Sequence, residues 1–232
     1  MKRIIFLLSV VFSFTAAYSQ NNQRSTGFKQ LEVSARMLED NSYWSSYHQL
    51  FMRGRDFNYA CITCPSFEPE SCLLIADSVL TLISLDHSLY SYIWKESHGK
   101  PGVIPTAATK SLPVSKRFAS ELCWLIDLGS LTADAYQNER MLDGSCTYFF
   151  ANGRAYRSSK TRADGKGENG NEASQVMKLL NLIKDAVAGK STLDEENVKK
   201  RIHQVYRNIF AHVPTWYTER EFYDIFKDAD KE

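Results

Sequence analysis

Residues 142–158 read LDGSCTYFFANGRAYRS and contain the clearest two-strand pattern in the chain. Residues 147–150 are β-branched or aromatic, which favours a strand. The dipeptide Asn152-Gly153 suits the type I′ turn of a hairpin, because both of its residues tolerate positive φ. Residues 154–157 then return in the opposite direction. We therefore predict a β-hairpin over Leu142–Ser158.

Three further segments upstream of the hairpin have the composition of strands. Residues 56–64 alternate along their length, and residues 71–85 are rich in Leu, Ile and Val with a break at Asp77-Ser78. Residues 89–94 alternate Leu, Ser and Ile with Tyr, Tyr and Trp. Strands in this order with short connections predict an antiparallel meander. Residues 95–110 are rich in Gly and Pro, and we predict a loop there.

Amphipathic helices are predicted by apolar residues at helical spacing in three long segments. The first runs from Ser115 to about residue 128, with Gly129 as its end, and the second covers residues 172–188, with Gly189 as its C-cap. The third, residues 192–210, begins with a Thr-x-x-Glu capping box. Shorter helical patterns occupy residues 31–38, 43–51 and 218–226.

These elements predict the α+β class. We expect an antiparallel sheet, made of the meander plus the hairpin, that is covered by amphipathic helices on one face. Residues 20–232 are predicted to form a single domain, in which the polar residues 21–28 are a mobile lead-in.

The first residues have the pattern of an export signal. Lys2 and Arg3 precede an apolar run over residues 4–17, and the small-residue pattern Ala17-Tyr18-Ser19 follows. We predict a signal peptide over residues 1–19, cleaved after Ser19. A run of about 14 residues is shorter than the roughly 20 that a membrane helix needs. The expected protein is therefore periplasmic or extracellular, with no membrane insertion.

Charge argues against a nucleic-acid partner. Without Lys2 and Arg3, 26 basic and 27 acidic residues remain, which is a net charge near −1. Such a balanced chain has no basic field to attract phosphate backbones.

The chain has five cysteines, which are Cys61, Cys64, Cys72, Cys123 and Cys146. In an exported protein some of them are candidates for disulfides. Cys64 and Cys72 flank the turn-like residues 65–70, and we predict them as a candidate disulfide. The Cys-x-x-Cys pair Cys61 and Cys64 lies on opposite faces of a regular strand, so we expect no metal site there.

Several of these motifs together resemble a family. The segment Pro65-Ser66-Phe67-Glu68-Pro69-Glu70 between two strands, then Trp94, a helix and Leu142-Asp143-Gly144 with Tyr148-Phe149-Phe150, resembles a family of small exported bacterial proteins of unknown function. The resemblance covers residues 57–187. Members follow the second hairpin strand with Trp-Ser-Pro, whereas this chain has Arg157-Ser158-Ser159. The family implies no activity, cofactor or catalytic residue.

No catalytic motif stands out. Ser145 follows Gly144 but lacks the Gly-x-Ser-x-Gly elbow of hydrolases, and it precedes a strand rather than a helix. We therefore expect a non-catalytic binding or interaction module, without a cofactor, that presents a sheet face or hairpin edge to a protein or glycan. Arg154, Tyr156 and Arg157 of the hairpin are the predicted binding residues.

Two alternatives stay open. The first is a hydrolase whose site is assembled from distant residues such as His87, His98 and Asp143. The second is an immunity-like protein that neutralises a toxin.

Overall fold

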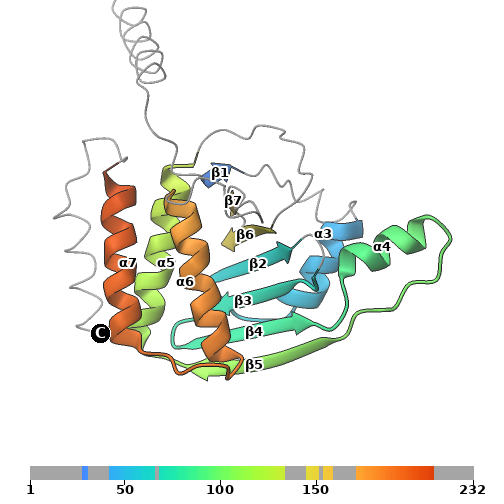
Figure 1. The fold of residues 1–232 in the computed structure, drawn as a ribbon, viewed down its shortest axis with the longest axis horizontal. Coiled ribbons are helices and arrows are strands. Elements are labelled where there is room, and N and C mark those ends of the chain that lie inside the picture. The colour runs from blue at the N-terminus through green and yellow to red at the C-terminus, as the bar shows by residue number, and fades with distance from the viewer. Residues whose placement is uncertain are drawn as a thin grey trace, which may run out of the picture.

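The computed structural model describes residues 28–30, 42–65, 68–133, 145–151, 154–158 and 171–211. Within these residues seven strands form one sheet in the order β1-β7-β6-β2-β3-β4-β5, and every neighbouring pair is antiparallel (Figure 1). The strands are β1 (Phe28–Gln30), β2 (Tyr59–Pro65), β3 (Ser71–Ile75), β4 (Val79–Leu85), β5 (Ala107–Pro113), β6 (Ser145–Ala151) and β7 (Arg154–Ser158). The predicted α+β class with an antiparallel sheet is confirmed.

The predicted hairpin is present as β6 and β7. Ala151 pairs with Arg154, which leaves residues 152–153 as the connection, and these two lie outside the described residues. The other side of β6 pairs with β2 in the middle of the sheet. The hairpin therefore links the meander β2-β3-β4 to the edge strand β1.

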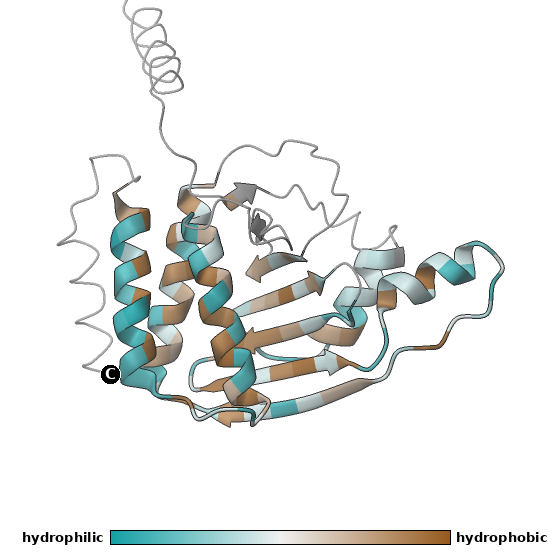
Figure 2. Cartoon of the chain, in the orientation of Figure 1, coloured by the Kyte–Doolittle hydropathy of each residue, from teal (hydrophilic) through white to brown (hydrophobic). Residues whose placement is uncertain are grey.

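Long amphipathic helices cover one face of the sheet, as predicted. They are α5 (Lys116–Leu131), α6 (Glu172–Val187) and α7 (Glu195–Phe210). Their apolar sides meet alternate residues of the strands, such as Cys61 of β2 and Leu73 of β3, in one core. Figure 2 shows α7 hydrophilic along its outer side and hydrophobic toward α5.

The opposite face of the sheet is also buried, which the one-face prediction did not include. It is covered by α3 (Ser42–Tyr47), the π-helix η1 (His48–Met52) and α4 (Leu89–Ser97). A second, aromatic core lies there and contains Trp44, Tyr47, Phe51 and Phe150. Because both faces are packed, residues 59–62 of β2 are all buried.

Helix α5 begins as predicted but extends beyond Gly129. The Ser115 side chain caps it by accepting a hydrogen bond from the Phe118 amide at 3.2 Å. The prediction that Gly129 ends the helix was wrong, since the helix runs to Leu131. A Cβ at Gly129 would lie 2.6 Å from the Phe28 ring, so close packing explains the glycine.

Phe28 corrects the predicted lead-in. It belongs to β1, where it is buried against the α5 side of the sheet. Residues 21–27 lie outside the described residues.

The strand predicted over residues 89–94 is instead the helix α4. Alternation over six residues is too short to exclude a helix. The Ser88 side chain accepts from the Ser91 amide at 3.2 Å, which is an N-cap. The prediction that residues 89–94 form the last strand of the meander was therefore wrong.

Two other boundaries differ from the sequence prediction. β5 begins inside the predicted loop 95–110 and is a largely exposed edge strand, so it lacks the apolar alternation that marks a half-buried strand. The third long helix is capped by Asp194 rather than by Thr192. Glu195 instead accepts hydrogen bonds from the amide and hydroxyl of Ser115, at 3.0 and 2.6 Å, which joins α7 to the start of α5. The helices predicted at residues 31–38 and 218–226 lie outside the described residues.

Candidate functional site

The most unusual buried group among the described residues is the amine of Lys184. Helix α6 forms because its apolar positions, among them Leu180 and Ile183, pack into the core with α5, α7 and the sheet. Lys184 follows Ile183 directly, and its side chain is only 8% exposed. A lysine taken out of water loses hydration that neighbouring groups must replace.

A row of hydroxyl residues lies on the sheet beneath Lys184. Thr147 of β6 is opposite Thr63 of β2, Thr63 is opposite Ser71 of β3, and Ser71 is opposite Ser84 of β4. Directly opposed residues of antiparallel strands point to the same face. Four strands therefore place four hydroxyls in one line, which we call the hydroxyl row (Thr147, Thr63, Ser71 and Ser84).

The amine of Lys184 meets the middle of the hydroxyl row. Its Nζ donates a hydrogen bond to Thr63 Oγ1, and it lies 3.3 Å from Ser71 Oγ. Thr63 Oγ1 in turn lies 3.1 Å from Thr147 Oγ1. Within the described residues both recorded hydrogen bonds of this amine go to uncharged hydroxyls.

Burial destabilises the charged form of this amine. It lowers the pKa of Lys184 from its ordinary value of 10.5, and the thiols of Cys61 and Cys72 contribute less, in the opposite direction. The neighbouring carboxylate of Asp185 is paired with Lys190, with 3.4 Å between Oδ1 and Nζ. The arrangement thus holds a desolvated amine next to serine and threonine hydroxyls.

A pocket of about 490 Å³ opens at this point, between the hydroxyl row and α6. Its lining residues are Thr63, Pro65, Glu68, Pro69, Ser71, Leu82, Ser84, Ser145, Asn181, Lys184, Asp185, Ala188 and Lys190. The volume lies in the range of small-molecule sites. We call this cavity the Lys184 pocket.

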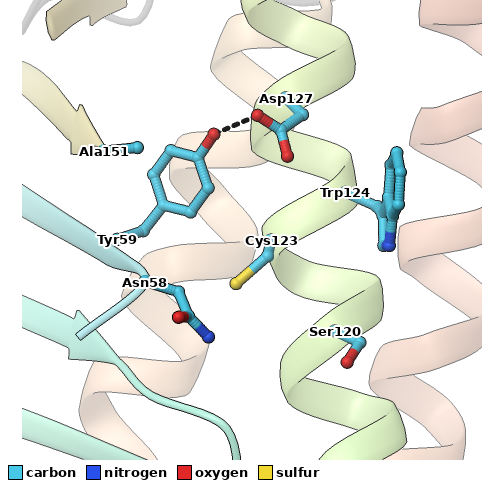
Figure 3. A pocket seen from close by; sticks show the side chains of 7 residues that line it. All are labelled: Asn58, Tyr59, Ser120, Cys123, Trp124, Asp127 and Ala151. Atoms are coloured by element: carbon cyan, nitrogen blue, oxygen red, sulfur yellow. Dashed lines mark hydrogen bonds between the residues drawn. The ribbon is translucent and has the colours of Figure 1, made fainter. Parts of the chain in front are cut away.

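A second pocket, of about 520 Å³, lies between the start of β2 and α5 (Figure 3). The Tyr59 hydroxyl donates a hydrogen bond to the Asp127 carboxylate across it. Cys123 points into the same space, where burial, with a smaller contribution from Asp127, raises its pKa to about 12. Its thiol is therefore poorly reactive near neutral pH, and Asp127 already accepts from Tyr59, so this pocket offers weaker chemistry than the Lys184 pocket.

An exposed apolar segment lies at the end of the sheet opposite the second pocket. Helix α4 and the loop that joins it to β5 project away from the body of the molecule, and we call residues 88–106 the α4 arm (Figure 1). The loop contains a hydrophobic stretch, visible in Figure 2. Among the described residues, the exposed large hydrophobic side chains of the arm are Tyr90, Trp94, Val103 and Ile104.

The predicted binding residues Arg154, Tyr156 and Arg157 belong to β7. Their backbone pairs with β6 and β1, so β7 is an inner strand rather than a free hairpin edge. Their side chains lie outside the described part of the structure. Their role in binding stays a prediction.

The two histidines of the hydrolase alternative are not brought together. His87 precedes α4 and contacts Asp86 at 3.1 Å, whereas His98 follows α4 and stacks on Trp94. The nine residues of α4 lie between them, which is about 13 Å of helix. Asp143 lies outside the described residues.

The cysteines are thiols in this structure. Cys61 and Cys64 do face opposite sides of β2, one in each core. Cys72 is opposite Ile62, and Cys64 is opposite Cys146, so the register does not make the predicted pair Cys64 and Cys72 direct neighbours. The cross-strand partner of Cys64 is a cysteine that the sequence analysis did not select.

Sequence reasoning also missed Lys184 and the hydroxyl row. One signal was present in the sequence. Thr63 lies on the same face of its strand as Tyr59 and Cys61, and Ser71 lies on the same face as Leu73 and Ile75. A hydroxyl at an inward position of several strands indicates a polar layer under a helix, but the register that aligns them is not readable from sequence.

No helix among the described residues is long and apolar enough to cross a membrane. The chain matches no protein-family model, no curated protein and no solved structure.

Proposed function

We propose that the protein is an exported interaction module that binds a protein partner through the α4 arm. The observation that supports this most is the exposure of Trp94 (43%) and Ile104 (69%) on one projecting segment. Apolar side chains that gather on a protruding surface mark interaction sites more often than isolated exposed ones do.

The arm is held in place at both ends, which favours binding because little conformational entropy is lost on association. At its start, the buried Glu70 carboxylate accepts from the amides of Leu89 and Tyr90 at 2.7 and 3.0 Å. At its end, Asp86 accepts from the amide and hydroxyl of Thr106 at 2.8 and 2.6 Å. The Thr106 hydrogen bonds also hold the pKa of Asp86 well below its ordinary value.

The tip of the arm is organised around the Trp94 ring. His98 stacks on it with 4.4 Å between ring centroids, and Lys100 Nζ lies 5.1 Å from its centroid. Gly102 packs against Tyr92, since a Cβ there would lie 2.8 Å from that ring. Because the Trp94 ring is already in contact with two side chains, and because Val103 and Ile104 are aliphatic, the surface suits a protein better than a flat sugar.

A photo-crosslinking amino acid at Ile104 tests this function. The matched control places it at Leu131 on α5, which is exposed to a similar degree at 59% against 69%. A discrete adduct from position 104 that disappears with Trp94→Ala supports the proposal. Equal adducts from both positions, or an adduct that contains glycan rather than protein, would overturn it.

Export forms a separate part of this proposal. It rests on the signal pattern of residues 1–19, and the mature chain should then begin at Gln20. N-terminal sequencing of protein recovered outside the cytoplasm tests it, and a mature chain that still begins at Met1 would refute it.

A further inference from the structure

We infer that the Lys184 pocket is an acyl-transfer site, in which Ser71 is the nucleophile and the Lys184 amine is its general base. The expected substrate class is a carboxylic ester with a short acyl chain. This activity is independent of the α4 arm, because the pocket lies on the α6 face of the sheet and α4 packs on the opposite face.

The geometry places the base next to the nucleophile. Ser71 Oγ and Lys184 Nζ are 3.3 Å apart, slightly longer than the roughly 2.6–3.2 Å of an engaged pair and within the looser spacing seen without substrate. Lys184 is fixed by its other hydrogen bond, to Thr63, so its position does not depend on a ligand. A neutral amine can then accept the proton of the Ser71 hydroxyl through its lone pair.

The protonation state suits this role. Burial lowers the pKa of Lys184, so a larger fraction of its amine is neutral near physiological pH than for an exposed lysine. Lysines act as general bases after such a shift. Both recorded hydrogen-bond partners of this amine within the described residues are hydroxyls, which do not stabilise the cation as a carboxylate would.

Ser71 is the better nucleophile of the two hydroxyls that contact the amine. Its side chain is partly exposed and lines the pocket. Thr63 is a secondary alcohol whose oxygen also contacts Thr147. A substrate entering from the pocket therefore meets Ser71 with less steric crowding.

The reaction has two steps, which are acylation of Ser71 and hydrolysis of the acyl-serine. The Lys184 amine removes the Ser71 hydroxyl proton while Oγ attacks the ester carbonyl, and the resulting ammonium returns that proton to the departing alcohol. An acyl-serine ester remains. Water, deprotonated by the same amine, attacks this ester and releases the carboxylic acid, and the proton returns to Ser71. No oxidant or cofactor is consumed.

The pocket also limits the substrate. About 490 Å³ admits a short acyl chain with a small alcohol, and Pro65, Leu82 and Ala188 supply apolar wall beside the reacting groups. Asn181, which also lines the pocket, brings an amide that can donate to a developing oxyanion.

A fluorophosphonate probe, which phosphonylates activated serines, tests the inference on the full chain. We expect one label, located at Ser71 by peptide mapping and absent from Ser71→Ala. Lys184→Met should reduce the labelling rate by about 100-fold or more, as expected when a general base is removed. Hydrolysis of 4-nitrophenyl acetate should fall in parallel.

Two matched controls separate this chemistry from background. Ser120→Ala removes another partly exposed serine that lines the second pocket, and Lys178→Met makes the same change at an exposed position of α6. Both should label at the wild-type rate. The wild-type rate should also rise with pH to a plateau whose midpoint lies below 10.5, the ordinary pKa of lysine.

Each adverse result is decisive. Failure to label wild-type protein at Ser71, or a labelling rate of Lys184→Met equal to that of the wild type, would show that Lys184 has only a structural role. If Lys184→Met does not fold, as judged by circular dichroism, Ser71→Ala and the wild-type pH profile decide the question. A midpoint at the ordinary lysine value would then overturn the inference.

Discussion

The Oε2 atom of Glu70 lies 2.7 Å from the backbone nitrogen of Leu89, the first residue of α4. A second hydrogen bond, from the Tyr90 amide at 3.0 Å, reaches the other oxygen of the same carboxylate. A buried side chain at the end of the β2–β3 loop thus stabilises the start of a helix that follows β4. The carboxylate also carries a negative charge, which the partial positive charge of a helix N-terminus favours.

We expect Glu70→Ala to lower the free energy of unfolding by about 2–3 kcal/mol, because hydrogen bonds to a buried charged group are lost. Glu68→Ala changes an exposed carboxylate two residues earlier and should cost little. Urea denaturation measures the loss, and hydrogen exchange at Leu89 and Tyr90 locates it. Equal stability of the two variants would show that Glu70 does not hold α4.

Gly129→Ala should destabilise the protein even though alanine favours helices. The added Cβ would lie 2.6–2.8 Å from three atoms of the Phe28 ring, which is fully buried. Overpacking of this kind typically costs about 1–3 kcal/mol, against about 1 kcal/mol gained in helix propensity. A Phe28→Leu background should relieve part of the clash, so the double-mutant cycle should show coupling. Additive effects would contradict the contact.

Lys184 should make stability depend on pH. The pKa of Lys184 is lowered in the folded state. At pH values between that lowered pKa and the ordinary 10.5, its amine therefore holds a proton in the unfolded chain but not in the folded protein. The cost of burying the cation is fully present below the folded-state pKa and is relieved as pH rises through this interval.

The free energy of unfolding of the wild type, measured relative to Lys184→Met, should therefore increase as the pH rises toward 10.5, the ordinary pKa of lysine. Lys178→Met, on the exposed side of α6, should show no such relative change. A flat difference for Lys184→Met would mean that its folded-state pKa is not lowered.

Oxidation should join Cys64 to Cys146 rather than to Cys72. Directly opposed residues of antiparallel strands have Cα atoms about 4.5–5.5 Å apart, within the roughly 4.4–6.8 Å of disulfides. Cys72 is opposite Ile62, two residues before Cys64 on β2, and such diagonal neighbours are about 7–8 Å apart. Oxidised glutathione can supply the exchange, since one molecule becomes two of glutathione as two protein thiols form one disulfide.

The exchange should be slow near neutral pH and accelerate as pH rises, because burial raises the pKa of the Cys64 thiol. Non-reducing peptide mapping by mass spectrometry identifies the bridge. It should persist in Cys72→Ser and disappear in Cys146→Ser. A bridge between Cys64 and Cys72 would instead confirm the pairing predicted from the sequence.

Local sequence patterns correctly predicted the elements whose conformation depends on interactions between residues close in the chain. The hairpin β6–β7, the Ser115 cap of α5 and the apolar stripe of α6 are all readable within short windows, because turn chemistry, capping and periodicity act between near neighbours. The opposite faces of Cys61 and Cys64 followed in the same way from strand geometry.

The sequence predictions were wrong where residues distant in the chain determine the local structure. Residues 89–97 form a helix whose first amides are bound by Glu70, about twenty positions earlier in the chain. β5 is a strand because β4 pairs with it along seven residues, although its own side chains are mostly exposed. Gly129 lies inside a helix because the Phe28 ring occupies the space of a side chain.

The sequence by itself determined the α+β class, the hairpin and the long amphipathic helices, since these depend on interactions between residues close in the chain. Only the tertiary structure decided which cysteines face each other, and only it brought Lys184 of α6 to Ser71 of β3. The two cysteines are 82 positions apart in the chain and Lys184 is 113 positions from Ser71, so no local sequence pattern predicts either contact. The candidate chemistry of the protein therefore depends on contacts that folding alone creates.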